Sequence, residues 1–396
     1  MSERQPDVVV VGAGLVGSLA ALLLARACPD LRITVIEPAW PAPLADDAPY
    51  DLRVSALTPA TLALFARLGL DQALAARRQC RYTRMQVWDG DGTGRVTFTA
   101  REASLPALGS LIENRQVQTV LGEALCREPA ITLRCPARLD DLLALRHGWR
   151  LTLADGEVLE TPLVIVADGA QSPARALAGI TTRDHDYGQH GLVCTVRTAA
   201  PHEGTAWQRF LATGPLAFLP LADAHHCSIV WTLPAAEAVR LRDLPAPDFA
   251  QALARAFEHR LGAVEVVGPR ASYPLLARHA DRYTLPGLAL IGDAAHSIHP
   301  LAGQGVNLGF ADAAALVDAL AASRNAGLPL AHARGLDRYS RVRRGENAVM
   351  LQAMTGFERL FASDDLHLRI LRNAGLNLVD RLPPVRQAII RRAAGH

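Results

Sequence analysis

Residues 292–307 combine, in one short run, the residue types that can bind a planar and partly anionic ligand. Asp293 follows an expected apolar strand at 288–291, and a loop with a proline and two glycines comes next. Glycine leaves room for a ligand to lie against the backbone. A helix is expected from Val306 to about Ser323, and the N–H groups of its first turn have no partners inside the helix and attract anionic groups. The run therefore indicates a ligand site.

A second glycine cluster, near the N-terminus, has the spacing of a dinucleotide-binding turn. Val8–Val11 is a run of valines, as expected of a parallel strand buried on both faces. The GxGxxG pattern follows, with Gly12, Gly14 and Gly17. In such a turn the first glycine permits the tight bend and the second lets the backbone approach a pyrophosphate. The third lets the following helix pack close to the strand.

The segment after this turn completes the dinucleotide pattern. A second expected strand, 32–36, ends at Glu37, where a carboxylate can accept hydrogen bonds from ribose hydroxyls. Strand, helix, strand and terminal acid together favour a dinucleotide site over a simple glycine-rich turn. Paired with the run at 292–307, the pattern indicates that the dinucleotide is a flavin.

A third segment, in the middle of the chain, again places a carboxylate at the end of a strand. An apolar strand is expected at 163–167, followed by Asp168 and Gly169. The carboxyl ends of strands in open α/β sheets are where ligands bind. Taken alone, the segment fits equally well a simple turn before a helix with Ser172 as its N-cap.

Composition sets limits on the class of protein. The chain has 396 residues, half of them hydrophobic, which predicts two linked domains with large cores. A formal net charge of +2 argues against a nucleic-acid binder. The chain contains no lysine, so mechanisms that need a lysine amine are excluded. Six scattered cysteines without CxxC spacing indicate reduced cytosolic thiols.

Residues 8–25 carry no charge, which by itself would fit a membrane span or signal peptide. The glycine fingerprint accounts for this stretch better, and no other stretch is expected to approach spanning length. The chain is therefore expected to be cytoplasmic, with peripheral contact to the inner face of the membrane as a further alternative.

The three motifs in this order resemble those of the FAD-dependent aromatic hydroxylases, the class A flavoprotein monooxygenases, over essentially the whole chain. Within that family the chain is most similar to the ubiquinone-biosynthesis hydroxylases, whose DxRxxAL and ENR segments match residues 51–57 and 113–115. Further segments are similar to members that hydroxylate 2-polyprenyl-6-methoxyphenol; they are residues 202–204, 209–210, 214–217, 228–231 and 273–275.

The resemblance implies a role for individual residues, and none of them is assigned as catalytic. Gly12, Ala13, Gly14 and Gly17 would hold the FAD pyrophosphate, and Glu37 the adenosine ribose. Arg53 and Arg115 would lie near the flavin or its phosphates, where a guanidinium suits oxyanions. Asp168 would serve both FAD and the nicotinamide cofactor, and Asp293 would bind a ribityl hydroxyl. The residues expected to line the flavin ring are Pro300, Gly303, Gly305, Val306 and Asn307.

The resemblance also implies the reaction. NADPH, or less favourably NADH, would reduce FAD, and O2 would form a flavin hydroperoxide that hydroxylates a prenylated phenol, 2-polyprenyl-6-methoxyphenol or a close relative. Alternatives are a sister hydroxylase acting at another ring carbon, a flavin-dependent prenyl reductase, and a non-catalytic member of a ubiquinone-synthesis assembly. A flavin halogenase would need an active-site lysine.

Histidines raise two further questions. His296 and His299 stand close together, but no carboxylate or cysteine has the spacing of a third metal ligand, so no metal site is expected. His296 is also a candidate proton relay for the phenol, because imidazole titrates near neutral pH.

The expected fold is α/β. A Rossmann-like FAD-binding domain of the para-hydroxybenzoate hydroxylase type would comprise residues 1–74, 109–175 and 287–344. An interleaved antiparallel substrate domain would comprise 85–99 and 181–283, and a C-terminal helical region 345–396. Apolar residues recur at helical spacing in the tail, and arginines dominate its charge. The tail could touch anionic lipid or pack on the body or on a second subunit of a homo-oligomer, and packing is favoured.

Overall fold

A computed structural model describes residues 5–42, 48–90, 92–297, 305–362 and 366–395, and only the backbone for much of 353–372. Its first layer is a six-stranded sheet in the order β19-β20-β12-β1-β2-β8. All neighbours pair in parallel except β19 with β20. The strands are β1 (Val8–Val11), β2 (Ile33–Ile36), β8 (Ile131–Arg134), β12 (Leu163–Val166), β19 (Thr284–Leu285) and β20 (Leu288–Leu290).

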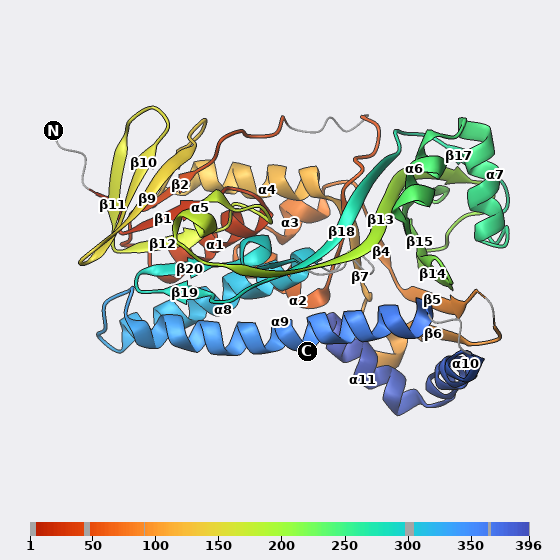
Figure 1. Cartoon of the computed structure of the whole chain (residues 1–396). Helices are drawn as coiled ribbons and strands as arrows, with labels where there is room; N and C mark the ends of the chain where they lie inside the picture. The colour runs from red at the N-terminus through yellow and green to blue at the C-terminus, as the bar shows by residue number, and fades with distance from the viewer. Residues whose placement is uncertain (1–4, 43–47, 91, 298–304, 363–365, 396) are drawn as a thin grey trace.

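Helices surround this parallel sheet (Figure 1). α1 packs against both α4 and α8, and α8 packs against α9. The helices of this part are α1 (Leu15–Ala27), α2 (Pro59–Arg67), α3 (Asp71–Ala75), α4 (Asn114–Arg127), α5 (Pro173–Leu177), α8 (Gly305–Asn325) and α9 (Ala333–Ala362).

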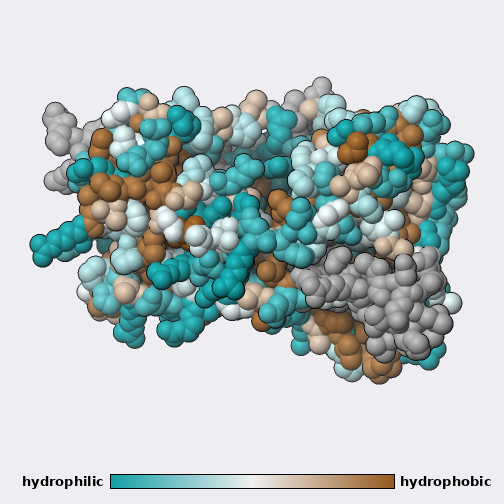
Figure 2. Space-filling model, in the orientation of Figure 1, coloured by the Kyte–Doolittle hydropathy of each residue, from teal (hydrophilic) through white to brown (hydrophobic). Residues whose placement is uncertain are grey.

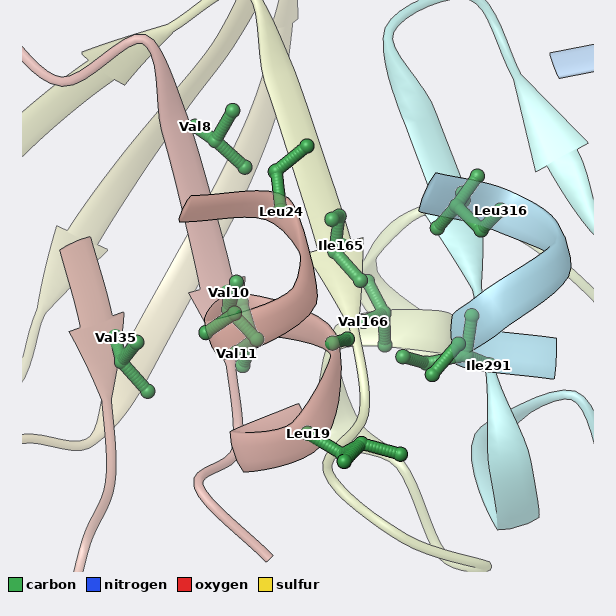
Figure 3. Packing of buried hydrophobic residues seen from close by; sticks show 14 of the residues in the cluster. Val8, Val10, Val11, Leu19, Leu24, Val35, Ile165, Val166, Ile291 and Leu316 are labelled. Atoms are coloured by element: carbon green, nitrogen blue, oxygen red, sulfur yellow. The ribbon is translucent and has the colours of Figure 1, made fainter. Parts of the chain in front are cut away.

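The core beneath α1 explains why the N-terminal segment folds as expected. All four valines of β1 are buried, as are all four residues of β12. Figure 3 shows Val8 and Val10 of β1, Ile165 of β12 and Leu24 of α1 in this core. A run of valines suits a strand covered on both faces, and the leucines and alanines of α1 are strong helix formers.

The second layer is a long, mostly antiparallel sheet in the order β21-β18-β13-β16-β15-β14-β5-β6, with β17 also paired to β13. Only β14 and β5 pair in parallel. Helices α6 (Ala235–Asp243) and α7 (Ala246–Ala256) belong to the same part of the molecule. The strands are β5 (Arg84–Asp89), β6 (Arg95–Thr99), β13 (Thr182–Thr198), β14 (Thr205–Leu211), β15 (Gly214–Pro220), β16 (His226–Pro234), β17 (Val264–Val266), β18 (Ala271–Ala280) and β21 (His296–Ser297).

Two small sheets complete the fold. One has the order β3-β7-β4, with β3 (Val54–Leu57), β7 (Gly109–Glu113) and β4 (Gln79–Tyr82). The other has the order β11-β10-β9, with β11 (Val158–Thr161), β10 (Gly148–Leu153) and β9 (Leu139–Leu145). Short 3-10 turns are η1 (Ala100–Ala103) and η2 (Gly292–Ala294).

The expectation that only residues 8–25 approach membrane-spanning length is wrong, because helix α8 does so too. Within the described residues, α8 is the one helix long and apolar enough to span a membrane. Its Phe310, Leu316 and Leu320 are fully buried, and the helix packs on α1 and α9. A core helix of a globular domain has the same length and composition, and the packing of α8 accounts for its apolar residues.

The C-terminal region packs on the body, which was the favoured alternative. α9 runs without a break through the expected boundary between 344 and 345. After it come α10 (Leu366–Arg381) and α11 (Pro383–Ala394). α10 covers β6, an edge strand: Asn373, Asn377 and Asp380 accept hydrogen bonds from backbone N–H groups of residues 94, 95 and 97. Covering an edge in this way prevents its pairing with another chain.

An apolar stripe on these two helices stays accessible. It consists of side chains that are 39–57% exposed, and Figure 2 shows apolar surface in this part of the molecule. The members of the stripe are Leu378, Leu382, Val385 and Ile389.

Candidate functional site

A cavity of about 770 Å³ lies between the parallel sheet and the long sheet. Its volume is within the range of small-molecule and cofactor sites. One side is formed by Gly14–Val16 of the fingerprint, Gly169–Gln171 and the start of α8. The opposite side comes from β13, β16 and β18 of the long sheet, with Val193, Val230 and Leu275. The carboxyl ends of β1, β12 and β20 thus meet an apolar wall contributed by the second layer.

The three glycines of the fingerprint are required for different reasons. Gly12 has φ +96°, and a Cβ on it would lie 2.6 Å from the carbonyl oxygen of Ala167. A Cβ on Gly17 would lie 2.0 Å from the carbonyl oxygen of Gly12. A Cβ on Gly14, which lines the cavity, would meet no atom within 4 Å. Protein packing therefore explains Gly12 and Gly17, whereas a bound molecule would explain Gly14.

Helix α1 begins at this open position. Gly14 is its N-cap and supplies no capping side chain. The first N–H groups of a helix carry partial positive charge and need acceptors. The cavity therefore offers an anion-binding helix start next to backbone that no side chain covers.

Glu37 lies beside the fingerprint but not in the cavity wall. Its Oε2 accepts a hydrogen bond from the backbone N–H of Ala13 at 2.7 Å, and its Oε1 accepts one from Ala39 at 3.2 Å. The carboxylate thus fixes the turn between β1 and α1.

The segment from Asp168 to Ser172 is both a helix cap and part of the surroundings of the cavity. Ser172 is the N-cap of α5, accepting a hydrogen bond from the N–H of Arg175 at 2.9 Å. Asp168 Oδ2 accepts a hydrogen bond from the N–H of Ala174, whereas Oδ1 is buried and has no partner within the described part of the chain. Burial raises the pKa of Asp168. Gly169, next to it, lines the cavity, so this turn serves a helix and a site together.

Asp293, Arg53 and Arg115 all line the same cavity. Burial raises the pKa of Asp293, and the nearby His296 and Arg53 oppose this effect without cancelling it. Asp293 is open to the cavity, but the surrounding protein replaces most of its bulk water. Arg115 donates a hydrogen bond to the carbonyl of Ala42 at 2.7 Å. One permanent cation, Arg53, therefore acts on a carboxyl group that resists ionisation, and Arg115 adds a second positive charge to the cavity wall.

The start of α8 contributes to the site only in part. Gly305 and Val306 line the cavity, but Asn307 is not in its wall. The side chain of Asn307 donates to the carbonyl of Ala56 at 2.7 Å and accepts from Thr58 and Thr61. It holds α8 against β3 and α2 instead of facing a ligand. Pro300 and Gly303 lie outside the described residues.

His296, the candidate proton relay, and residues that the motifs did not single out complete the site. His296 lines the cavity and contacts the buried carboxylate of Asp312. Arg343 and Asn347 of α9 bind the same carboxylate. Asp312 could have been found from its place on the helix that follows the run 292–307, but no local pattern relates that helix to α9. In the part of the chain that the structure describes, no three His, Cys, Asp or Glu residues are grouped to hold a metal ion.

Comparison with known families identifies the chain. The family described as "FAD binding domain" matches residues 5–353. The chain belongs to this family. Among its relatives is the 3-demethoxyubiquinol 3-hydroxylase of Escherichia coli (strain K12), 38% identical with both chains fully covered. The ubiquinone hydroxylase UbiL of Rhodospirillum rubrum is 37% identical over the whole of this chain and 90% of its own length.

Solved structures share the fold of this FAD-binding-domain protein. The p-nitrophenol 4-monooxygenase PnpA from Pseudomonas putida DLL-E4 superposes with a TM-score of 0.79 at 21% identity, covering 98% of this chain and 96% of its own. PqsL from Pseudomonas aeruginosa, a probable FAD-dependent monooxygenase, gives 0.76 at 23% identity, covering 94% and 100%. The expected fold class is confirmed.

These findings establish the class of enzyme. The protein is a FAD-dependent aromatic hydroxylase of the ubiquinone-biosynthesis group, with FAD as cofactor and NAD(P)H as reductant. The residues present fit that cofactor, because Gly14 leaves open backbone at the start of α1 and two arginines, Arg53 and Arg115, line the same cavity. The ring that it hydroxylates is a separate question.

Proposed function

We propose that this enzyme hydroxylates the ring of a prenylated phenol in ubiquinone biosynthesis, with O2 and NAD(P)H as co-substrates. One observation carries the proposal: a single cavity joins the dinucleotide turn to an apolar wall. Val193 and Val230 are directly paired across β13 and β16, and both line it. An apolar wall of this kind suits a ring with a hydrocarbon substituent.

The motif residues are proposed to hold FAD along the other wall. Gly12, Ala13, Gly14 and Gly17 would receive the pyrophosphate at the start of α1. Glu37 would bind the adenosine ribose while keeping its hydrogen bond to Ala13, and Asp293 would bind the ribityl chain. Arg53 and Arg115 would compensate negative charge, and Asp168 would use its Oδ1 for FAD or the nicotinamide cofactor.

The protein itself would position the reactants and exclude water from the reacting ring. Bound FAD supplies electron transfer from NAD(P)H and activation of O2. The long sheet covers the cavity with Val193, Val230 and Leu275, which keeps bulk water from the reacting ring.

Two prenylated ring compounds are candidate substrates. The matching segments in 202–231 and 273–275 favour 2-polyprenyl-6-methoxyphenol, whereas the name of the Escherichia coli relative favours 3-demethoxyubiquinol. The purified enzyme should oxidise NADPH faster with one of them than without substrate. Mass and NMR analysis of the product should show one added oxygen and its ring carbon. Reduction of the prenyl chain without O2 uptake would instead indicate a prenyl reductase.

A variant in the apolar wall tests whether the ring binds there. Val230→Phe should raise the KM for the prenylated phenol several-fold and leave the Kd for FAD unchanged, since Val230 lies on the far wall. Val239→Phe is the matched control, because Val239 lies on α6, is 39% exposed and does not line the cavity. Equal KM values in both variants would place the ring elsewhere.

A further inference from the structure

A buried charge cluster lies directly behind the cavity wall. Asp312, on α8, is fully buried. Its Oδ2 accepts hydrogen bonds from the N–H of Gly292 at 3.0 Å and from His296 Nε2 at 2.5 Å. Its Oδ1 accepts from Arg343 Nε at 2.7 Å and from Asn347 Nδ2 at 3.2 Å. One carboxylate therefore connects the loop before the site, the cavity wall and α9.

This arrangement decides which nitrogen of His296 carries a proton. Burial acts to raise the pKa of Asp312, but His296 and Arg343 outweigh it and hold that pKa below its ordinary value. An ionised carboxylate only accepts hydrogen bonds. Both carboxylate oxygens already accept hydrogen bonds from N–H donors, so His296 Nε2 donates to Oδ2 and Nδ1 is the ring nitrogen left to accept.

The second nitrogen of His296 is the one that a bound molecule can reach. His296 is a residue of the cavity wall although only 3% of its surface is exposed, and its Nδ1 has no hydrogen bond to any residue in the described ranges. Asp293 lines the cavity close to His296, and the two groups interact electrostatically. A bound cofactor that reaches Asp293 is thus within the neighbourhood of Nδ1.

The charged and titratable neighbours of His296 come from several elements. Asp293 belongs to η2, Asp312 to α8 and Arg343 to α9. His279 of β18 is the register partner of His296, and burial lowers its pKa. Tyr283 stacks on the imidazole with ring centroids 6.0 Å apart. Asp312 and Arg343 carry opposite charges, and Arg343 also pairs with Glu346 of α9.

We propose that His296 Nδ1 hydrogen-bonds FAD in the cavity, and that Asp312 is the positioning residue that keeps the proton of His296 on Nε2. The inference depends on the use of FAD and not on the identity of the phenol. It can therefore fail or hold independently of the proposed substrate.

The wild-type protein allows a direct test. ¹⁵N-histidine NMR of the FAD-free protein should show His296 protonated at Nε2, and addition of FAD alone should shift the Nδ1 signal. A proton on Nδ1 in place of Nε2 would overturn the proposal. So would an Nδ1 signal that stays unchanged at saturating FAD, or one that moves only when a phenol is added.

Two substitutions separate a structural role from a role in binding. His296→Gln keeps a donor near the Nε2 position for Asp312 but has no nitrogen at the Nδ1 position. It should unfold at close to the wild-type temperature without FAD, and its Kd for FAD should rise about 10-fold, as for the loss of one hydrogen bond. If His296 had only a structural role, this variant would bind FAD with wild-type affinity, and that result would overturn the proposal.

Asp312→Asn removes the acceptor that orients the ring. It should give a mixture of His296 tautomers and a Kd for FAD raised as in His296→Gln. His279→Asn is the matched control, because His279 lies beside His296 on β18 but is not in the cavity wall. Its Kd for FAD should stay within about 2-fold of wild type, which is the scatter expected where no hydrogen bond to FAD is lost. The hydrogen bond that this variant does lose joins His279 Nε2 to the Tyr283 hydroxyl, inside the protein. An equal loss of affinity in His279→Asn would show that any change in this region acts through folding, and would also overturn the proposal.

Discussion

Glu37, at the end of β2, accepts a hydrogen bond from the backbone N–H of Ala13, inside the glycine fingerprint, at 2.7 Å. The same carboxylate that the motif assigns to a ribose therefore also shapes the turn that receives the pyrophosphate. Loss of this group should affect both ends of the proposed adenosine site.

Glu37→Ala should weaken FAD binding by about 10- to 100-fold, the range for hydrogen bonds to a charged group. Titration of the FAD-free protein with FAD, followed by flavin fluorescence, measures this Kd. Glu157→Ala is a suitable control, because the Glu157 carboxylate pairs with Arg134 at 3.5 Å and both side chains are about one-third exposed. Unchanged affinity in Glu37→Ala would contradict the assignment of Glu37.

Gly14→Val and Gly17→Ala should fail in opposite ways. A side chain at position 14 would enter empty space in the cavity, whereas one at position 17 would collide with the carbonyl oxygen of Gly12. Gly14→Val should therefore fold with a near-wild-type Tm but take up no FAD. Gly17→Ala should lose stability even without FAD. Thermal unfolding with and without FAD distinguishes the two, and a strongly destabilised Gly14→Val would refute the ligand explanation for Gly14.

The raised pKa of Asp293 predicts a cost in stability that depends on pH. In the folded protein the carboxyl keeps its proton above pH 3.8, where the unfolded chain has begun to lose it. As pH rises from 3.8 through the raised folded pKa, the unfolded state is favoured. Asp293→Asn should therefore raise the Tm of the FAD-free protein at pH 7 and not at pH 3.5, and should weaken FAD binding. A Tm that does not change at pH 7 would argue against a raised pKa for this carboxyl group.

The alternative of lipid contact through the tail predicts that the exposed apolar stripe binds anionic membranes. Arg381, Arg391 and Arg392 are exposed on the same helices, which suits acidic headgroups. Val385→Ser with Ile389→Ser should reduce co-sedimentation with vesicles containing phosphatidylglycerol. Leu143→Ser with Val158→Ser, two exposed apolar residues of the β9–β11 sheet, is the control. Equal sedimentation of all three proteins would dispose of the lipid alternative.

Local sequence determined the parts of the site that lie within one stretch of chain. The valines of β1 with Gly12, Gly14 and Gly17 predicted strand, turn and helix, because each depends on neighbours a few residues away. The same holds for Ser172 as a helix cap and for Asp293 after β20. The Val8–Val11 strand and the long helix after Gly305 were found where they were expected.

Tertiary structure alone decided which distant segments meet. Asn307 binds the carbonyl of Ala56, 251 residues away, so its polar side chain serves packing and not the cavity wall. Arg343 and Asn347 reach Asp312 from another helix, and Val193 and Val230 face the dinucleotide turn from another sheet. Hydrophobic periodicity records which face of an element is buried, but it does not record against which partner, because any apolar surface of matching shape would bury it equally well.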